Sequence, residues 1–326
     1  MKPKHILYLK GQHCETTTTG TLLLQQGIQL SEPMLFGIGE GLGFIFWKMK
    51  GMDFPFIGGR CKTDVLTQNI CKNLNLTLEA KETSSVTKAW LGVKELIDNG
   101  NVVGLKLDCY HLEYFSNAMH FAGHYAALYD FDDEHAYLVD TAQQGSLVKT
   151  SLKSLALSRS EKGAMSSRNL FYTIRGSANN YKLEHAIKQA IRNNARVFLH
   201  PPISNMAYKG ILKTADGILN WFGQSKNIES DFYTMYVLME MAGTGGALFR
   251  NLYRDFLKES APILNSDLLH KAEELYSEIA REWVLVADLF KKTSETKEIR
   301  YLEQAADVLK KLSVQEYQAM LLLSGI

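Results

Sequence analysis

The sequence lacks an excess of charge of either sign. Its 36 Lys and Arg residues are balanced by 35 Asp and Glu residues, which leaves a formal net charge of +1. Proteins that bind nucleic acid usually carry a basic excess, so the composition argues against nucleic acid as a partner. Long hydrophobic runs are also missing, and the N-terminal stretch "MKPKHILYLK" contains only the short run "ILYL". These absences predict a soluble, cytoplasmic protein with no signal peptide and no membrane partner.

Cysteine is scarce, and its spacing excludes two further classes of protein. The four cysteines stand singly in the first third of the chain, at Cys14, Cys61, Cys71 and Cys109. No C-x-x-C pair and no paired histidine spacing of the zinc type accompanies them, so the sequence predicts no metal site. A disulfide framework is not expected without an export signal. Each cysteine is by default a small buried residue until its context indicates otherwise.

A change in pattern divides the chain into two predicted domains, for which 326 residues leave room. Up to residue 176, short β-branched and aromatic runs alternate with helical periodicity at 15–26 and 86–98. The predicted strands cover 100–108, 124–131, 135–141 and 169–175. After "GSANN" the strand signal disappears and amphipathic helices follow one another. We therefore predict an α+β domain with an antiparallel sheet over 1–176 and an all-α domain over 177–326.

The stretch "GHYAALYDFDDEHAYLVDTAQQG" reads as a β-hairpin. Two strand-like runs flank the acidic segment "DFDDEHA", whose composition is typical of a hairpin loop. In a hairpin, the residue that opens the first strand lies beside the residue that closes the second, which predicts a contact between His124 and Asp140. A carboxylate in that position fixes the tautomer of the imidazole and stabilises its protonated form.

Cys14 stands at the start of a predicted helix in "GQHCETTTTGTLLLQQGI". The unpaired N–H groups of a helix start and an adjacent base both favour a thiolate. With His124 as the base and Asp140 as its orienting group, the chain would hold a Cys-His-Asp triad. Taken singly, each residue has an ordinary structural alternative: a buried cysteine, a hydrogen-bonded histidine and an aspartate at a strand exit. Their combination in this order favours the triad.

Neighbours of Cys14 offer further candidates. His13 is a rival base, but adjacent residues on a turn or helix point apart. Gln12 could form an oxyanion hole together with the backbone N–H of Cys14, although it could equally be an ordinary surface residue. The run from Thr16 to Thr19 consists of poor helix formers, whose hydroxyls either line a pocket or serve helix packing.

Three stretches together resemble the butirosin biosynthesis protein H family. They are "GQHCETTTTGTLLLQQGIQLSEPMLFGIGEGLGF", "GHYAALYDFDDEHAYLVD" and, in the region similar to that family's helical domain, "AGTGGALFRNLYRDFLKES". The resemblance implies an N-terminal domain similar to papain-like and bacteriocin-processing cysteine peptidases. The family's named member transfers an acyl group from an acyl carrier protein thioester to an aminoglycoside amine.

Carried onto this chain, the resemblance makes Cys14 the acyl-accepting nucleophile, His124 the general acid/base and Asp140 its orienting group. One departure concerns the oxyanion donor. The peptidases carry a glutamine upstream of the cysteine where this chain has Tyr8, so Gln12 would have to replace it.

The alternating glycines of "LFGIGEGLGF" do not form a nucleotide motif. The run fails the G-x-G-x-x-G pattern and no Walker lysine follows, so no nucleotide and no other cofactor is expected. A tight loop near the active-site cleft is the favoured interpretation. Glu32 and Glu40 are candidates for contacting a substrate amine, with a surface or structural role as the more ordinary alternative.

Two arginines lie one turn apart after a glycine-rich helix entry in "EMAGTGGALFRNLYR". Arg250 and Arg254 could bind a phosphate such as that of a phosphopantetheine arm. The favoured alternative is a bend between helices followed by two solvated arginines.

These observations predict a cysteine-dependent acyltransferase acting through an acyl-enzyme at Cys14. Its expected partners are a small-molecule amine acceptor and, as a candidate donor, an acyl carrier protein. A hydrolase or peptidase with the same triad is the first alternative, and a non-catalytic binding protein on the same fold is the second. A homo-oligomer formed through the helical half remains open.

Overall fold

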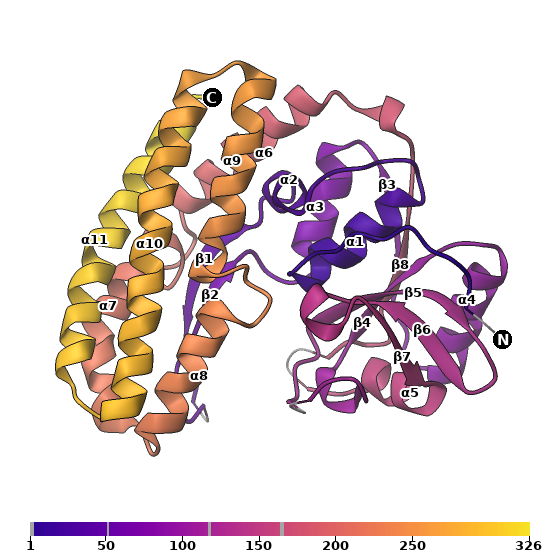
Figure 1. Cartoon of the computed structure of the whole chain (residues 1–326), viewed down its shortest axis with the longest axis horizontal. Coiled ribbons are helices and arrows are strands. Elements are labelled where there is room, and N and C mark those ends of the chain that lie inside the picture. The colour runs from indigo at the N-terminus through magenta and orange to yellow at the C-terminus, as the bar shows by residue number, and fades with distance from the viewer. Residues whose placement is uncertain (1–2, 51, 117–118, 164–165) are drawn as a thin grey trace. The chain divides into compact units, whose positions relative to one another are not determined.

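The chain divides into two units that each combine two separate segments (Figure 1). The computed structural model describes residues 3–50, 52–116, 119–163 and 166–326. The first unit contains Met1–Leu35 and Thr63–Lys182, and the second contains Phe36–Lys62 and Leu183–Ile326. The sequence predicts one boundary near Ser177, whereas the segment 36–62 groups with the C-terminal helices.

A six-stranded antiparallel sheet forms the centre of the first unit, in the order β3-β8-β4-β5-β6-β7. Its strands are β3 (Thr77–Lys81), β4 (Val103–Leu107), β5 (His124–Phe131), β6 (His135–Val139), β7 (Leu147–Ser151) and β8 (Phe171–Arg175). The α+β class is confirmed. The four predicted strands are present, while the edge strands β3 and β7 lack the apolar alternation that would have revealed them.

Helices cover both faces of this sheet. They are α1 (Cys14–Leu24), α3 (Val65–Asn73), α4 (Val86–Asp98) and α5 (Leu152–Ser160). On the face covered by α4 and α5, Val103, Leu105 and Leu107 of β4 join the hydrophobic core. The intervening β4 residues, Gly104 and Lys106, point to the face on which α1 packs, so β4 is buried on both sides.

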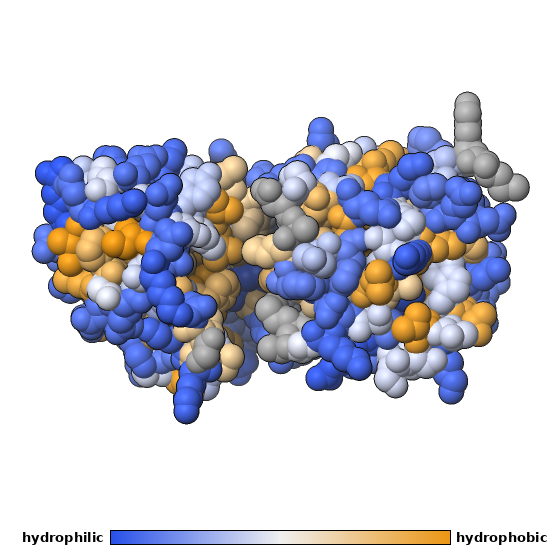
Figure 2. All heavy atoms as spheres, turned by 90° about the horizontal axis from the view of Figure 1, so that it is seen from below, coloured by the Kyte–Doolittle hydropathy of each residue, from blue (hydrophilic) through white to orange (hydrophobic). Residues whose placement is uncertain are grey.

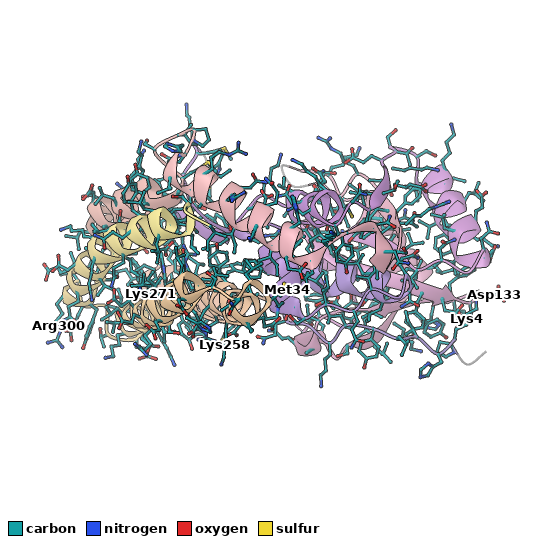
Figure 3. All side chains as sticks on the ribbon, turned by 90° about the horizontal axis from the view of Figure 1, so that it is seen from above. Lys4, Met34, Asp133, Lys258, Lys271 and Arg300 are labelled. Atoms are coloured by element: carbon teal, nitrogen blue, oxygen red, sulfur yellow. The ribbon has the colours of Figure 1, made fainter. Side chains whose placement is uncertain are left out.

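The N-terminal segment runs beside the β5–β6 hairpin. The backbone N–H of Lys4 donates a 2.8 Å hydrogen bond to Asp130 at the end of β5. Lys4 and Asp133 mark this end of the unit in Figure 3. The hairpin predicted from "DFDDEHA" is confirmed, with antiparallel pairing and an irregularity between Leu128 and Asp130.

The second unit consists of a two-stranded antiparallel ribbon and a set of helices. The ribbon pairs β1 (Leu42–Trp47) with β2 (Phe56–Arg60). The longer helices are α6 (Leu183–Leu199), α7 (Ala207–Gln224), α8 (Ile228–Glu240), α9 (Arg250–Leu264), α10 (Asp267–Thr296) and α11 (Arg300–Leu323). Helix α10 packs against α8, α9 and α11. Among the described residues, no helix has the length and apolarity needed to span a membrane.

Aromatic contacts explain why the segment 36–62 belongs with these helices. The ring of Phe44 lies 5.6 Å from that of Trp283, and Phe46 stacks on Trp221 at 5.4 Å. The apolar residues of the ribbon therefore contact helices that lie more than about 150 positions further along the sequence. Local periodicity carries no information about contacts between residues so far apart.

Figure 2 shows hydrophobic side chains in groups on the face it presents, with hydrophilic residues spread between them.

The glycine-rich stretch differs from the expected tight loop beside the active-site cleft. Gly37 lies inside α2 (Glu32–Ile38), Gly43 lies in β1, and only the residues around Glu40, which has a φ of 54°, form a turn. A Cβ at Gly37 would overlap the ring of Phe256 on α9. This glycine is therefore required by close helix packing within the second unit.

Candidate active site

Cys14 is the first residue of α1, as the sequence predicts. His13 before it has an extended backbone, with φ of −95° and ψ of 129°, and its carbonyl accepts the first helical hydrogen bond, from the N–H of Thr17 at 2.9 Å. Cys14 is partly exposed, unlike most of the helix that follows. The Gly11 carbonyl accepts a 2.8 Å bond from the N–H of Ala142, so the loop after β6 is tied to the approach to Cys14.

The carboxylate of Glu32 occupies the start of α1. It accepts hydrogen bonds from the backbone N–H groups of Gln12 at 2.9 Å and His13 at 2.8 Å, and from the Thr16 hydroxyl at 2.8 Å. A negative group at a helix N-terminus satisfies unpaired donors and complements the helix dipole. Glu32 is therefore a capping residue in this structure, with its oxygens already occupied, and the interpretation as a ligand for a substrate amine is not supported by its contacts.

The threonine run serves the packing of α1. Thr16 to Thr19 are fully buried. The hydroxyl of Thr17 donates to the carbonyl of His13 at 2.7 Å, and Thr19 bonds to Thr67 of α3 at 2.8 Å. These bonds satisfy hydroxyls that would otherwise be buried without a partner. Of the two alternatives for the run, packing is the one that the structure bears out.

His124 and Asp140 are in contact, as the hairpin predicts. The pairing of Ala127 with Val139 puts Asp140 opposite Ala126, so that His124 lies one diagonal step away on the same face. Nε2 of His124 lies 2.7 Å from Oδ2 of Asp140. Both side chains are buried, and this carboxylate fixes Nε2 as the protonated nitrogen, which leaves Nδ1 for a second partner.

Three further groups hold this pair in place. The hydroxyl of Tyr114 donates to Oδ2 of Asp140 at 2.7 Å, and the N–H of Thr141 donates to Oδ1 at 2.6 Å. The ring of Phe115 meets that of His124 edge-on, with centroids 5.2 Å apart. Sequence reasoning missed Tyr114 and Phe115 because they lie in an irregular segment with no motif or periodicity.

The electrostatics of the site favour a protonated imidazole. Burial, the largest single influence, lowers the pKa of His124, but the charge of Asp140 and the sulfur charges of Cys109 and Cys14 together raise it well above 6.5. Burial and the same carboxylate raise the pKa of Tyr114 well above 10, so its hydroxyl stays a donor. A negative charge on Cys14 would therefore stabilise the protonated form of His124.

Cys71, Cys109 and His13 are less suited to this chemistry. Cys109 follows β4, whose Leu107 pairs with His124, but its side chain is buried. Burial raises the pKa of Cys71 to about 12. Nδ1 of His13 lies 3.3 Å from the Thr16 hydroxyl. Both Cys14 and Cys109 influence the charge of His124, but only Cys14 of these two combines partial exposure with a helix start.

The remaining binding candidates lie in different places. Gln12 is exposed next to Cys14, which keeps it available as an oxyanion donor. Glu40 belongs to the second unit and accepts a 2.8 Å hydrogen bond from Asn193. Arg254 of α9 is partly exposed and bonds to Asp255 and Asn251.

Arg250 is neither a solvated residue nor placed to meet a phosphate from solvent. Its side chain is 0% exposed and forms a two-pronged ion pair with Glu316 of α11, with both N–O distances at 2.9 Å. Its guanidinium also lies 4.7 Å from the ring centre of Trp283 and donates to the carbonyls of Gly59 and Leu248. These contacts make Arg250 an internal link within the second unit.

A second polar cluster in the first unit brings potential metal ligands together. Ligand atoms of His111, His120 and Glu161 lie within 4.8 Å of one another. The sequence predicts no metal site because its cysteines lack the spacing of a zinc motif. His111, His120 and Glu161 include no cysteine and are not closely spaced in the sequence, so a search for such a motif does not find them.

Comparison with known families agrees with the motifs. Residues 13–141 match the family described as butirosin biosynthesis protein H, N-terminal. Residues 153–323 match a domain of unknown function, DUF4872. The N-terminal part of the chain therefore belongs to the butirosin biosynthesis protein H family. The first match contains Cys14, His124 and Asp140. No match was found among curated proteins.

Proposed function

We propose that this member of the butirosin biosynthesis protein H family is a cysteine-dependent acyltransferase. The proposal rests on one arrangement: Cys14 at the start of α1, within electrostatic range of an imidazole that Asp140 orients. A thiol, a base and an orienting group in this order are the components of acyl transfer through a covalent intermediate. The N-terminal helix on an antiparallel sheet is the feature that supports a papain-like arrangement.

The first half-reaction transfers the acyl group to the enzyme. The Cys14 thiolate attacks the carbonyl carbon of the donor thioester, and the oxyanion receives hydrogen bonds from the Cys14 N–H and the Gln12 side chain. The tetrahedral intermediate collapses with breakage of the donor C–S bond. The protonated His124 gives its proton to the departing thiolate, which leaves as a thiol.

The second half-reaction passes the acyl group to an amine. Neutral His124 accepts a proton as the amine nitrogen attacks the acyl-enzyme, and the thiolate of Cys14 leaves, which regenerates the starting ion pair. The family description supports a role in biosynthesis. The acceptor in this proposal is a small-molecule amine, and the donor is carried by an acyl carrier protein. Water in place of the amine would make the same chain a hydrolase.

Trapping the acyl-enzyme tests this proposal. The full chain is incubated with an acyl-N-acetylcysteamine thioester, quenched in acid and digested for mass spectrometry. We expect one acyl adduct on the peptide that contains Cys14, its loss in Cys14→Ser and its retention in Cys109→Ser. Equal labelling of the Cys14→Ser variant, or no labelling of the wild type, would overturn the assignment.

The acceptor is tested by partition of the product. With added aminoglycoside or a simple primary amine, an acyltransferase forms the acyl-amine in competition with the free acid. Formation of the free acid alone, at every amine concentration, would instead support the hydrolase.

A further inference from the structure

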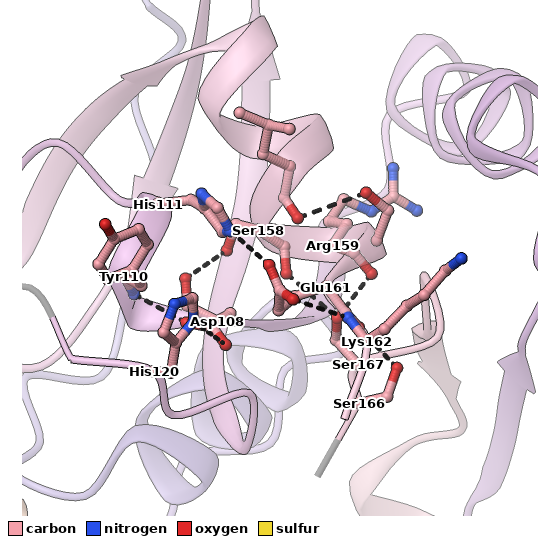
Figure 4. Close-up of polar contacts among 12 residues, drawn as sticks. Asp108, Tyr110, His111, His120, Ser158, Arg159, Glu161, Lys162, Ser166 and Ser167 are labelled. Carbon is pink, nitrogen blue, oxygen red and sulfur yellow. Dashed lines mark hydrogen bonds and ion pairs between the residues drawn. The ribbon is translucent and has the colours of Figure 1, made fainter. Parts of the chain in front are cut away.

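Two histidines and a glutamate meet at one end of the first unit (Figure 4). His111 is the last residue of η1 (Cys109–His111), and Glu161 directly follows α5. Nε2 of His111 lies 2.6 Å from Oε2 of Glu161. His120 lies in the segment before β5 and faces the same point, and the three potential ligand atoms are all within 4.8 Å of one another.

The exposed ring of His120 is held on two sides. Nδ1 of His120 lies 3.4 Å from Oδ2 of the buried Asp108, whose other oxygen accepts a 2.8 Å bond from the N–H of Tyr110. The Tyr110 ring stacks on the imidazole, with centroids 4.0 Å apart and planes at 16°. A carboxylate that binds one ring nitrogen is the arrangement that orients a histidine for a metal through its other nitrogen.

The local charges favour a cation. Glu161 places a carboxylate at the C-terminal end of α5, where the helix dipole is negative, and Asp108 adds a second carboxylate nearby. Both would be stabilised by a positive ion. Lys162 also lines this cavity, and its positive charge would repel a cation. Its side chain is exposed, so solvent screens that charge.

The dimensions are compatible with a metal after small side-chain shifts. Ligands about 2.1 Å from a tetrahedral zinc ion lie roughly 3.4 Å apart. The 2.6 Å contact between His111 and Glu161 must therefore widen, and the longer separations must shorten. A cavity of about 350 Å³, lined in part by Asp108, His120 and Glu161, leaves room for a water molecule as the fourth ligand.

We propose that His111, His120 and Glu161 bind one divalent first-row metal ion of the zinc class, with Asp108 orienting His120. Two imidazoles and one carboxylate form a donor set that suits such ions. The ion would join both ends of the segment 111–120 to the end of α5. The same segment carries Tyr114 and Phe115, which contact Asp140 and His124. A bound metal would therefore stabilise the segment that holds His124 and Asp140 in place.

Metal titration of the full chain tests this site, in a Cys14→Ser background because a thiol can itself bind zinc. The chelator-treated protein is titrated with Zn²⁺ by calorimetry and with Co²⁺ by visible absorption. We expect one equivalent to bind, and at least about a tenfold weaker affinity after His120→Ala or Glu161→Gln. His185→Ala, on the exposed surface of α6, is the matched control and should bind as the parent does.

Thermal unfolding gives an independent measurement. Zn²⁺ should raise the Tm of the parent and of the His185→Ala control but leave that of His120→Ala unchanged, since a ligand raises Tm only by binding the folded state in preference to the unfolded one. The proposal is wrong if the parent binds no Zn²⁺, or if His120→Ala and Glu161→Gln bind it as tightly as the parent. Neither outcome depends on acyl transfer, because the Cys14→Ser background removes the nucleophile.

Discussion

The hydroxyl of Tyr114 donates a 2.7 Å hydrogen bond to Oδ2 of Asp140, the same oxygen that contacts His124. Tyr114→Phe removes a donor from a fully buried carboxylate, which should lower the free energy of unfolding by about 1–3 kcal/mol. Urea unfolding measures this loss. Tyr110→Phe, which alters an exposed tyrosine in the same region, is the control and should change stability little. Equal effects of the two substitutions would contradict the assignment.

Alkylation by iodoacetamide reports on the pair of Cys14 and His124. At about pH 6.5 we expect Cys14 to react at least about tenfold faster in the wild type than in His124→Ala, because the imidazolium stabilises the thiolate. Mass spectrometry follows each cysteine separately. Cys71 is the internal control, since its raised pKa of about 12 keeps it a thiol in both proteins. Identical Cys14 rates in the two proteins would argue against the pair.

Stability should depend on pH through His124. Its pKa in the folded protein lies well above 6.5, so its protonated form is favoured by folding. This contribution is complete below about pH 6.5 and is lost as the pH rises through the folded-state pKa. The wild type should therefore lose more stability than His124→Gln between about pH 6 and about pH 9, as measured by urea unfolding. Parallel pH profiles for the two proteins would be inconsistent with the shift.

The buried pair of Arg250 and Glu316 should be costly to break. Arg250→Met leaves the Glu316 carboxylate buried without its partner and should lower the free energy of unfolding by about 3–5 kcal/mol. Combining it with Glu316→Leu should restore part of that loss. Arg254→Ala, with a partly exposed side chain, serves as the comparison and should cost under about 1 kcal/mol. A similarly small loss for Arg250→Met would show that the pair contributes little.

Glu32 separates a capping role from a substrate role. Glu32→Ala removes the acceptor for two backbone N–H groups at the start of α1, which should cost about 1–2 kcal/mol of stability without any ligand present. Thermal unfolding of the substrate-free chain measures it. Glu134→Ala, at an exposed position of the hairpin loop, is the matched control. If Glu32→Ala were as stable as the wild type, the capping role would be wrong and a contact with substrate would be favoured.

Local patterns account for the part of this fold that the sequence predicts. The β5–β6 hairpin and the start of α1 depend on residues close together in the chain, so turn composition and periodicity suffice to place Cys14, His124 and Asp140. The role of Glu32 depends instead on a segment about twenty residues away, and the burial of Arg250 depends on Glu316. No local pattern contains such information.

The same limit applies to β1 and β2 and to the cluster of His111, His120 and Glu161. The ribbon is a short pair whose aromatic residues meet helices that are distant in the sequence. The cluster is assembled by an irregular segment and the end of a helix, so its ligands lack the short spacing by which metal motifs are found in a sequence.

The division of each unit into two segments has a consequence for synthesis on the ribosome. When residue 182 has been made, all strands of the central sheet exist, but β1 and β2 still lack the helices whose rings pack against Phe44 and Phe46. Phe46 gains its aromatic partner only when Trp221 has been translated, and Phe44 only when Trp283 has been. During that interval the apolar residues of the ribbon lack their native partners, and exposed apolar surface of this kind makes a partly synthesised chain prone to aggregation.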